Sequence, residues 1–392
     1  MGAWEVENKK RIRSLDILRG LAILGTLGTN IWLFAYLGDI NYIFTFNHNQ
    51  WWLSGDDFLR ILFLSLINGK LLGLLAIMFG VGLELKYQQS KRLNQTWPGR
   101  YIWLSLLLLM EGLLHFIFVL EYDILMSYAV TAIVVSLIVK MRKRMIRITM
   151  ISAAAIHLFF IVLVFLGVLT NSIGDELVAV PKEVMNLYQH GSWMNQIQYR
   201  LFHFWELRTE AIFVIPFNIC MFLIGVLLVR IGAFDNNSNG INIRKRMMKT
   251  GLLVGLPLNL LLFVPGGYFD FPVRYVFAPI LSIGYMGAIS FLIEKFQAFS
   301  LWRVLEKVGK MSLSCYVLQN VLSSILFYGW GLGLGGHPRS FFVIFVWVLI
   351  CLFQMLFAVL WLRYFKMGPM ESARKRLANL TIRKNIKKDL KM

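Results

Sequence analysis

Runs of about 20 apolar residues recur along most of this sequence, and each is long enough to cross the roughly 30 Å hydrocarbon core of a bilayer as a helix. Hydrophobic residues make up 58% of the chain and charged residues only 16%, whereas roughly a quarter of a soluble domain is charged. The sequence therefore predicts an all-α, polytopic transmembrane helix bundle that forms a single integral membrane domain. We expect about ten spans, at residues 15–37, 58–83, 101–120, 122–140, 148–170, 211–232, 250–266, 273–293, 311–333 and 341–363.

Lysine and arginine residues gather in every second connection between these runs. Residues 38–57 contain none of them, whereas the C-terminal tail 364–392 is strongly basic. Cytoplasmic connections of membrane proteins carry such an excess of positive charge, so the pattern places both termini in the cytoplasm. The formal charge of +19 is then explained by topology and by contact with anionic lipid at the cytoplasmic face, and we predict no nucleic-acid partner.

Two segments outside the spans are long. Residues 171–210 form an extracytoplasmic connection whose mixture of aromatic and polar residues is typical of helices lying on the membrane surface. The basic tail 364–392 is predicted to be either a weak surface-binding helix or a disordered end.

The first apolar run contains Asp16, Arg19 and Asn30, which are unusual in a membrane helix. A charged side chain near the bilayer centre costs at least a few kcal/mol, so such residues normally pair or face a cavity. Asp16 and Arg19 are three residues apart, so a helix places them on one face. We interpret all three as substrate-binding residues. In the alternative interpretation, Arg19 reaches the lipid head groups and Asp16 caps the helix.

The third apolar run carries Glu111 and His115, which are four residues apart and share a helix face. A short turn leads to the fourth run and brings Asp123 close to the same helix pair. A carboxylate beside a histidine orients the ring and raises its basicity, which suits a general base or an acyl acceptor. These three residues are candidate catalytic residues. Alternatively, a hydrogen bond between His115 and Glu111 only locks two spans together.

The second apolar run carries Asn68 and Lys70 near its middle. A lysine this deep should face a counter-charge or a cavity, and its ammonium group could bind a phosphate or carboxylate of a substrate. A structural ion pair with Asp16, Glu111 or another acidic residue is an equal alternative. The three cysteines lie inside apolar runs without the spacing of a metal site, so we predict neither a disulfide nor a bound metal.

Several motifs, taken in their order along the chain, resemble the YeiB-type family of bacterial membrane proteins, which is known as a family of unknown function. The resemblance implies a multi-pass protein of the bacterial cytoplasmic membrane. Near the end, this chain has GPMES where the family commonly has GPLEW or GPVEW, and the missing tryptophan concerns packing more than chemistry. The matching motifs include RSLDILRGLAILGTLGTN (13–30), NGKLLGLLAIMFGVGLE (68–84), VGKMSLSCYVLQN (308–320) and LRYFKMGPMES (362–372).

The YeiB-type family is similar in turn to transmembrane acyltransferases such as heparan glucosaminide acetyltransferase. That distant resemblance implies transfer of an acyl group from cytosolic acyl-CoA or acetyl-CoA to a small-molecule, glycan or lipid-linked acceptor at the outer face. It also implies a membrane-embedded histidine. His48, in the sequence HNQW, matches the H-x-x-W pattern of the lysosomal enzyme, whereas His115 fits the YeiB-type pattern. The alternatives are a transporter that uses the same buried polar residues and a non-catalytic membrane scaffold. A homodimer is compatible with all three functions.

Overall fold

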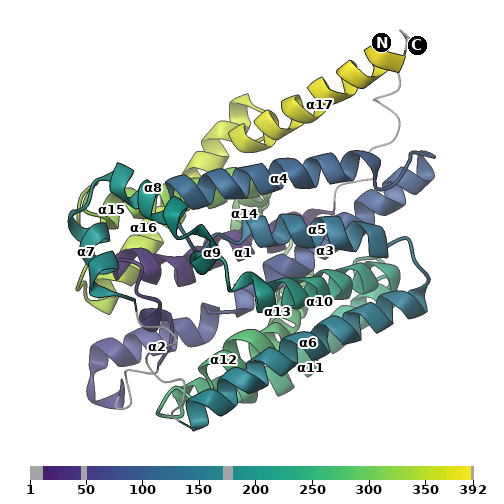
Figure 1. Cartoon of the computed structure of the whole chain (residues 1–392). Coiled ribbons are helices and arrows are strands. Elements are labelled where there is room, and N and C mark those ends of the chain that lie inside the picture. The colour runs from purple at the N-terminus through teal and green to yellow at the C-terminus, as the bar shows by residue number, and fades with distance from the viewer. Residues whose placement is uncertain (1–11, 46–50, 171–179, 390–392) are drawn as a thin grey trace.

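The computed structural model describes residues 12–45, 51–170 and 180–389, and in this part of the chain every regular element is helical (Figure 1). The prediction of an all-α, polytopic bundle is confirmed. Eight of the described helical stretches are long and apolar enough to cross a membrane, and two further apolar helices, α5 and α15, are shorter. The helices of the bundle are α1 (Arg13–Ala35), α2 (Gly55–Ile67), α3 (Lys70–Arg92), α4 (Gly99–Phe118), α5 (Leu125–Ile138), α6 (Lys143–Leu169), α10 (Ala211–Arg230), α11 (Ser238–Asn259), α13 (Ala278–Lys295), α15 (Ser312–Phe327) and α16 (Ser340–Tyr364).

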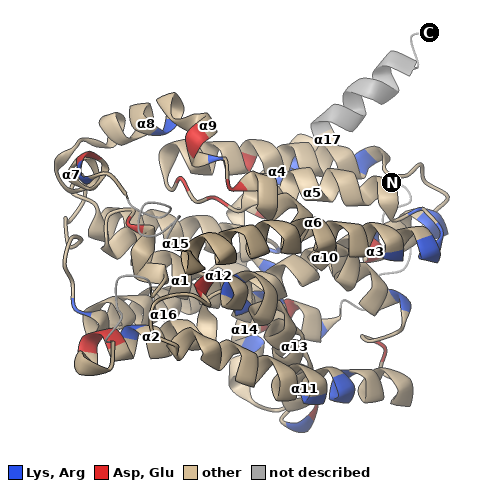
Figure 2. Cartoon of the chain, turned by 60° about the horizontal axis from the view of Figure 1, so that its bottom comes forward, with Lys and Arg blue, Asp and Glu red and all other residues tan. Residues whose placement is uncertain are grey.

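The remaining helices lie at the two ends of the bundle. The described part of the connection 171–210 folds into short helices, as expected, and the basic tail is helical in its described part. Charged groups separate these ends: Figure 2 shows lysine and arginine gathered where α3 ends and α11 begins. We call this the basic end, which the charge pattern predicts to be cytoplasmic, and we call the opposite end the outer end. The elements concerned are η1 (Ile40–Ile43), α7 (Lys182–His190), α8 (Trp193–Phe202), α9 (Phe204–Leu207), α12 (Asp270–Pro272), the π-helical turn η5 (Val273–Phe277), α14 (Ser300–Lys310) and α17 (Pro369–Asp389).

Helix α1 occupies the centre of the bundle. Its most apolar stretch is 83% buried, against 22% for the corresponding stretch of α6. It packs against α3, α14, α15 and α16, while α6 touches α10 and leaves a row of large apolar side chains exposed. A helix with such a surface is stable only in an apolar solvent, so the outer helices face lipid.

One predicted span proves to be two helices. The run 58–83 is interrupted at Asn68 and Gly69, where α2 ends and α3 begins. Gly69 has a φ of +75°, and a Cβ atom there would lie 2.5 Å from the carbonyl oxygen of Arg274. This backbone conformation and this close approach both require glycine. The apolar run alone gave no sign of the break, because α2 and α3 are both apolar.

Candidate functional site

A cavity of about 440 Å³, which we call the inner cavity, opens toward the basic end. Its walls come from α1, α3, α4, α5, the junction of α14 with α15, and the start of α17. Its depth is apolar, with side chains such as Ile23, Leu75, Phe79 and Leu108. Its charged lining consists of Arg19, Lys86, Lys310, Lys366, Arg374 and Glu371, so cations predominate over a single carboxylate.

Two of these cations have no ion pair with any described carboxylate, namely Lys86 and Lys366. By contrast, Lys310 contacts Glu306 at 2.6 Å, and Arg19 lies 3.4 Å from Asp16. The predicted Asp16–Arg19 pair therefore forms, and Arg19 faces the inner cavity as well. The inner cavity thus combines uncompensated positive charge with an apolar interior.

A second cavity, the outer cavity, lies nearer the outer end and has a volume of about 70 Å³. Asn30 and Asn68 line it, together with Glu210, Arg274 and Tyr275. Arg274 and Tyr275 belong to the π-helical turn η5, an irregularity that often marks functional sites. The guanidinium group of Arg274 donates a 2.6 Å hydrogen bond to Oδ1 of Asn68. The lining is rich in amide, hydroxyl and charged groups, as expected for a site that binds a polar molecule.

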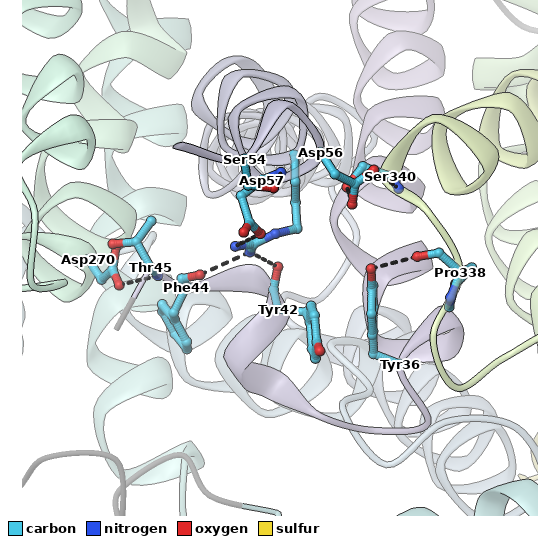
Figure 3. Close-up of polar contacts among 11 residues, drawn as sticks. Tyr36, Tyr42, Phe44, Thr45, Ser54, Asp56, Asp57, Asp270, Pro338 and Ser340 are labelled. Carbon is cyan, nitrogen blue, oxygen red and sulfur yellow. Dashed lines mark hydrogen bonds and ion pairs between the residues drawn. The ribbon is translucent and has the colours of Figure 1, made fainter. Parts of the chain in front are cut away.

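A strap of chain, residues 36–45, follows α1, and Figure 3 shows polar contacts that hold it. Arg60, which is buried, donates to the carbonyl oxygens of Tyr42 (2.8 Å) and Phe44 (3.1 Å). The carboxylate of Asp270 accepts hydrogen bonds from the backbone N–H and the hydroxyl group of Thr45. Arg60 and Asp270 thus hold the strap in place, and Ile40 and Ile43 of the same strap line the cavity.

Three ionisable side chains lie between the two cavities: His115, Asp123 and Tyr316. Nδ1 of His115 is 3.0 Å from Oδ1 of Asp123, an ion-pair distance, although the carboxylate lies out of line with the ring N–H. The hydroxyl group of Tyr316 donates to the same oxygen over 3.4 Å. Asp123 lines the outer cavity and Tyr316 lines the inner cavity, whereas His115 lines neither. The predicted approach of Asp123 to His115 is therefore found.

An amide chain extends this cluster. Nδ2 of Asn320 lies 3.2 Å from Nε2 of His115, and Nδ2 of Asn30 donates to Oδ1 of Asn320 over 3.4 Å. With the amide donating to Nε2, the ring proton is on Nδ1, which faces Asp123. The sequence analysis singled out neither Asn320 nor Tyr316 as a site residue. Tyr316 and Asn320 are four residues apart and therefore share a helix face, which is the sequence feature that could have grouped them.

Gly112 explains how α4 approaches the start of α5 so closely. A Cβ atom at this position would lie 2.7 Å from the backbone nitrogen of Met126 and 2.9 Å from Oδ2 of Asp123. The same carboxylate oxygen accepts a 3.0 Å hydrogen bond from Met126 N. The absent side chain of Gly112 is therefore what allows His115 and Asp123 to meet.

Glu111 does not act as the partner of His115. The guanidinium group of Arg374, in the first turns of α17, binds its carboxylate, with Nε 3.1 Å from Oε1 and Nη2 in contact with Oε2. Nearby, Glu371 accepts a hydrogen bond from the backbone of Leu313 at the start of α15. Burial favours such a pairing, because a lone carboxylate at this depth would be costly. The tail thus begins as a docked helix that forms part of the inner-cavity wall.

The other predicted site residues are dispersed. Asn68 donates to the carbonyl oxygen of Ile43 over 2.9 Å and reaches the outer cavity. His48 lies outside the described residues. His157, which was not among the predicted site residues, bonds to two backbone carbonyls, at 3.0 and 3.3 Å, as a core histidine would. Among the described residues, no group of three or more histidine, cysteine, aspartate or glutamate side chains could hold a metal ion.

Lys70 differs from its prediction. It is fully buried, its ammonium group has no hydrogen-bond partner, and no described carboxylate forms an ion pair with it. It lines neither the inner nor the outer cavity, because the break at Gly69 turns the start of α3 toward Asp270 and Arg274.

Replacing Lys70 by methionine is therefore expected to stabilise the protein. Methionine keeps the length of the side chain and removes a buried charge that has no counter-ion, a change worth about 1–3 kcal/mol. The thermal midpoint of the purified protein in detergent should rise by several degrees. A lower midpoint for Lys70→Met than for the wild type would mean that the ammonium group has a stabilising partner.

Comparison with known proteins supports the expected family. Residues 228–381 match the profile of a family described as "Protein of unknown function (DUF418)". The chain is 25% identical to the "Uncharacterized protein YxaH" of Bacillus subtilis (strain 168), over 92% of each chain. It is 27% identical to the "Uncharacterized protein YeiB" of Escherichia coli (strain K12), over 91% of this chain and 94% of the relative. No solved structure matches the chain significantly. The chain is thus similar to YeiB-type proteins over most of its length, and residues 228–381 match the profile of the DUF418 family.

Proposed function

We propose that the protein is a transmembrane acyltransferase of the bacterial cytoplasmic membrane. It moves an acyl group from cytosolic acyl-CoA or acetyl-CoA to an acceptor at the outer face. The observation that supports this most strongly is the placement of the Asp123–His115–Tyr316 cluster between two cavities of different character. The inner cavity receives the donor and the outer cavity receives the acceptor.

The chemistry of the inner cavity suits acyl-CoA. The phosphates of the donor need cations, and Lys86 and Lys366 are available for them because they have no ion pair with a described carboxylate. The acyl chain needs an apolar channel, which the deep part of the cavity supplies. The acyl carbonyl would then lie near Tyr316, at the point where the cavity ends.

The outer cavity suits a polar acceptor with a hydroxyl or amino group. Asp123 lines this cavity and takes the proton of the attacking group, while His115 orients the carboxylate and stabilises its charge. Amides of Asn30 and Asn68 and the charged groups of Glu210 and Arg274 would orient a small molecule, a glycan or the head of a lipid-linked substrate.

Group transfer fits this arrangement better than passage of a whole solute. Ile124 lines both cavities and lies where they meet. We expect this apolar side chain to separate the two compartments, so that a solute could pass between them only if the side chain were displaced. Transport would need such a displacement, whereas acyl transfer needs only the reacting atoms to meet.

The test is saturable binding and turnover of acyl-CoA by the purified protein in detergent, followed by thermal shift and release of free CoA. Donors should include acetyl-CoA and longer acyl-CoAs, with glucose and glycerol as hydroxyl acceptors. The proposal predicts stabilisation by at least one donor and CoA release that depends on the acceptor. Absence of both with every donor would exclude the proposed reaction.

The double variant Lys86→Gln, Lys366→Gln is expected to raise KM for acyl-CoA by about tenfold or more, because it removes two charge-assisted contacts to phosphate. The value of kcat should change little, since neither side chain reaches the reacting atoms. The matched control is Lys91→Gln, a substitution at the basic end that lies outside the inner cavity. An equal change in the control would show that the effect comes from general surface charge.

A further inference from the structure

The cluster between the cavities forms a continuous ionisable path from the outer cavity to the inner cavity. Asp123 is exposed to the outer cavity, Tyr316 is exposed to the inner cavity, and the two are hydrogen-bonded over 3.4 Å. His115 contacts the same carboxylate oxygen at 3.0 Å. Their exposed fractions are only 1% for Asp123, 1% for Tyr316 and 3% for His115, so bulk water does not surround the path.

Acyl transfer across a membrane raises a question of charge balance. The reaction forms a bond between the acceptor oxygen and the acyl carbon, and it breaks the thioester C–S bond, whose electron pair leaves on sulfur. The acceptor loses a proton in the outer cavity, and the thiolate in the inner cavity gains one, because a thiol with a pKa near 8.5 is protonated at neutral pH. One proton is therefore released on the outer side and one is taken up on the inner side.

Whether the reaction moves net charge across the membrane depends on where the acceptor's proton goes. Because the electron pair of the C–S bond stays on sulfur, the transferred acyl group formally carries one positive charge outward. If the acceptor's proton returns inward, the two movements cancel. If the proton instead escapes to the outer solution, each turnover moves one charge outward against an inside-negative potential, which opposes it by about 50-fold per 100 mV in the equilibrium constant.

We infer that Asp123, His115 and Tyr316 carry the acceptor's proton inward to the departing thiolate, so that acyl transfer is electroneutral. This inference rests on the proposed acyltransferase function. Asp123 takes the proton from the acceptor. His115 stabilises the negative charge of the Asp123 carboxylate, which is lost when the carboxylate is protonated and regained when the proton leaves. Tyr316 passes a proton to sulfur. The hydroxyl group of Tyr316 then regains its proton from Asp123, which restores the starting state.

The experiment counts protons per turnover in liposomes. Protein is reconstituted with glucose or glycerol and a pH-sensitive dye trapped in the lumen, and acetyl-CoA or octanoyl-CoA is added outside. Only molecules whose inner cavity faces outward then react. Electroneutral transfer predicts release of CoA with no change in luminal pH, and a rate that is unaffected by a potassium–valinomycin potential.

Two outcomes overturn the inference in distinguishable ways. Release of CoA together with about one luminal proton per turnover would refute the inward path and leave the acyltransferase function standing. No CoA release with any donor would remove the function and the inference together.

A substitution tests the role of Tyr316 directly. Tyr316→Phe is expected to slow CoA release by about 100-fold or more, because the variant cannot donate to sulfur. Its remaining turnover should deposit one proton in the lumen, a change that a loss of packing would not produce. The matched control is Tyr285→Phe, which removes an exposed hydroxyl that donates to the carbonyl oxygen of Leu66 outside both cavities. An unchanged luminal pH during the residual turnover of Tyr316→Phe would exclude Tyr316 from the path.

Discussion

Replacing Asp123 by asparagine is expected to lower the rate of acyl transfer by about 10²- to 10⁴-fold. Asparagine has nearly the same shape as aspartate, but it cannot accept a proton from the acceptor or pair with the histidine ring 3.0 Å away. Binding of acyl-CoA should be unchanged, because Asp123 lines the outer cavity and not the inner one. The measurement is CoA release at saturating donor, with thermal shift by acyl-CoA as the binding readout.

His115→Asn should give a similar loss of kcat without a change in donor binding. His115 contacts Asp123 at 3.0 Å but lines neither cavity. The controls are Asp235→Asn and His190→Asn, which alter exposed residues outside the site. Full activity of Asp123→Asn would remove this cluster from the reaction. Loss of acyl-CoA binding in the same variant would indicate that the two cavities are coupled.

Replacing Arg200 by methionine is expected to destabilise the protein by about 3–5 kcal/mol, the usual cost of leaving one member of a buried ion pair alone. Arg200, in α8, is fully buried. Its Nε lies 3.4 Å from Oε2 of Glu121 and 3.2 Å from the hydroxyl oxygen of Tyr188. Burial and the neighbouring carboxylate raise the pKa of Tyr188 well above its ordinary value. The phenol therefore stays protonated and donates to Glu121 over 2.7 Å.

The consequence of this substitution should be a large fall in the thermal midpoint of the detergent-solubilised protein. The double variant Glu121→Gln, Arg200→Met removes both charges and should recover part of the loss, since no unpaired charge remains. Lys182→Met, at the exposed start of α7, is the control. A double variant as unstable as Arg200→Met would show that packing, rather than the unpaired carboxylate, carries the effect.

Local patterns in the sequence predicted the parts of the structure that depend on neighbours along the chain. Apolar run length identified the helices of the bundle because length and composition decide whether a helix can lie in lipid. The short turn after α4 predicted that Asp123 lies near His115, because few residues separate them. The same reasoning paired Asp16 with Arg19 correctly.

The same local patterns did not predict contacts between residues that are far apart in the sequence. Arg374 reaches Glu111 from 263 positions away along the chain, and nothing in either local sequence specifies this contact. Tyr316 belongs to the site for the same reason: its helix is brought there by packing against α1. The break at Gly69 was also missed, because a glycine within an apolar run does not reveal its own backbone angle. That break explains why Lys70 faces neither cavity.

The docking of α17 against α4 and α15 has a consequence for damaged molecules. The inner cavity combines side chains from the first third of the chain with Lys366, Glu371 and Arg374, close to residue 370. A copy that proteolysis has shortened before this point would retain its membrane helices yet lack one wall of the inner cavity and the cation that neutralises Glu111. With the proposed function, such a fragment would be inert toward acyl-CoA, so a single cleavage before residue 366 would end activity.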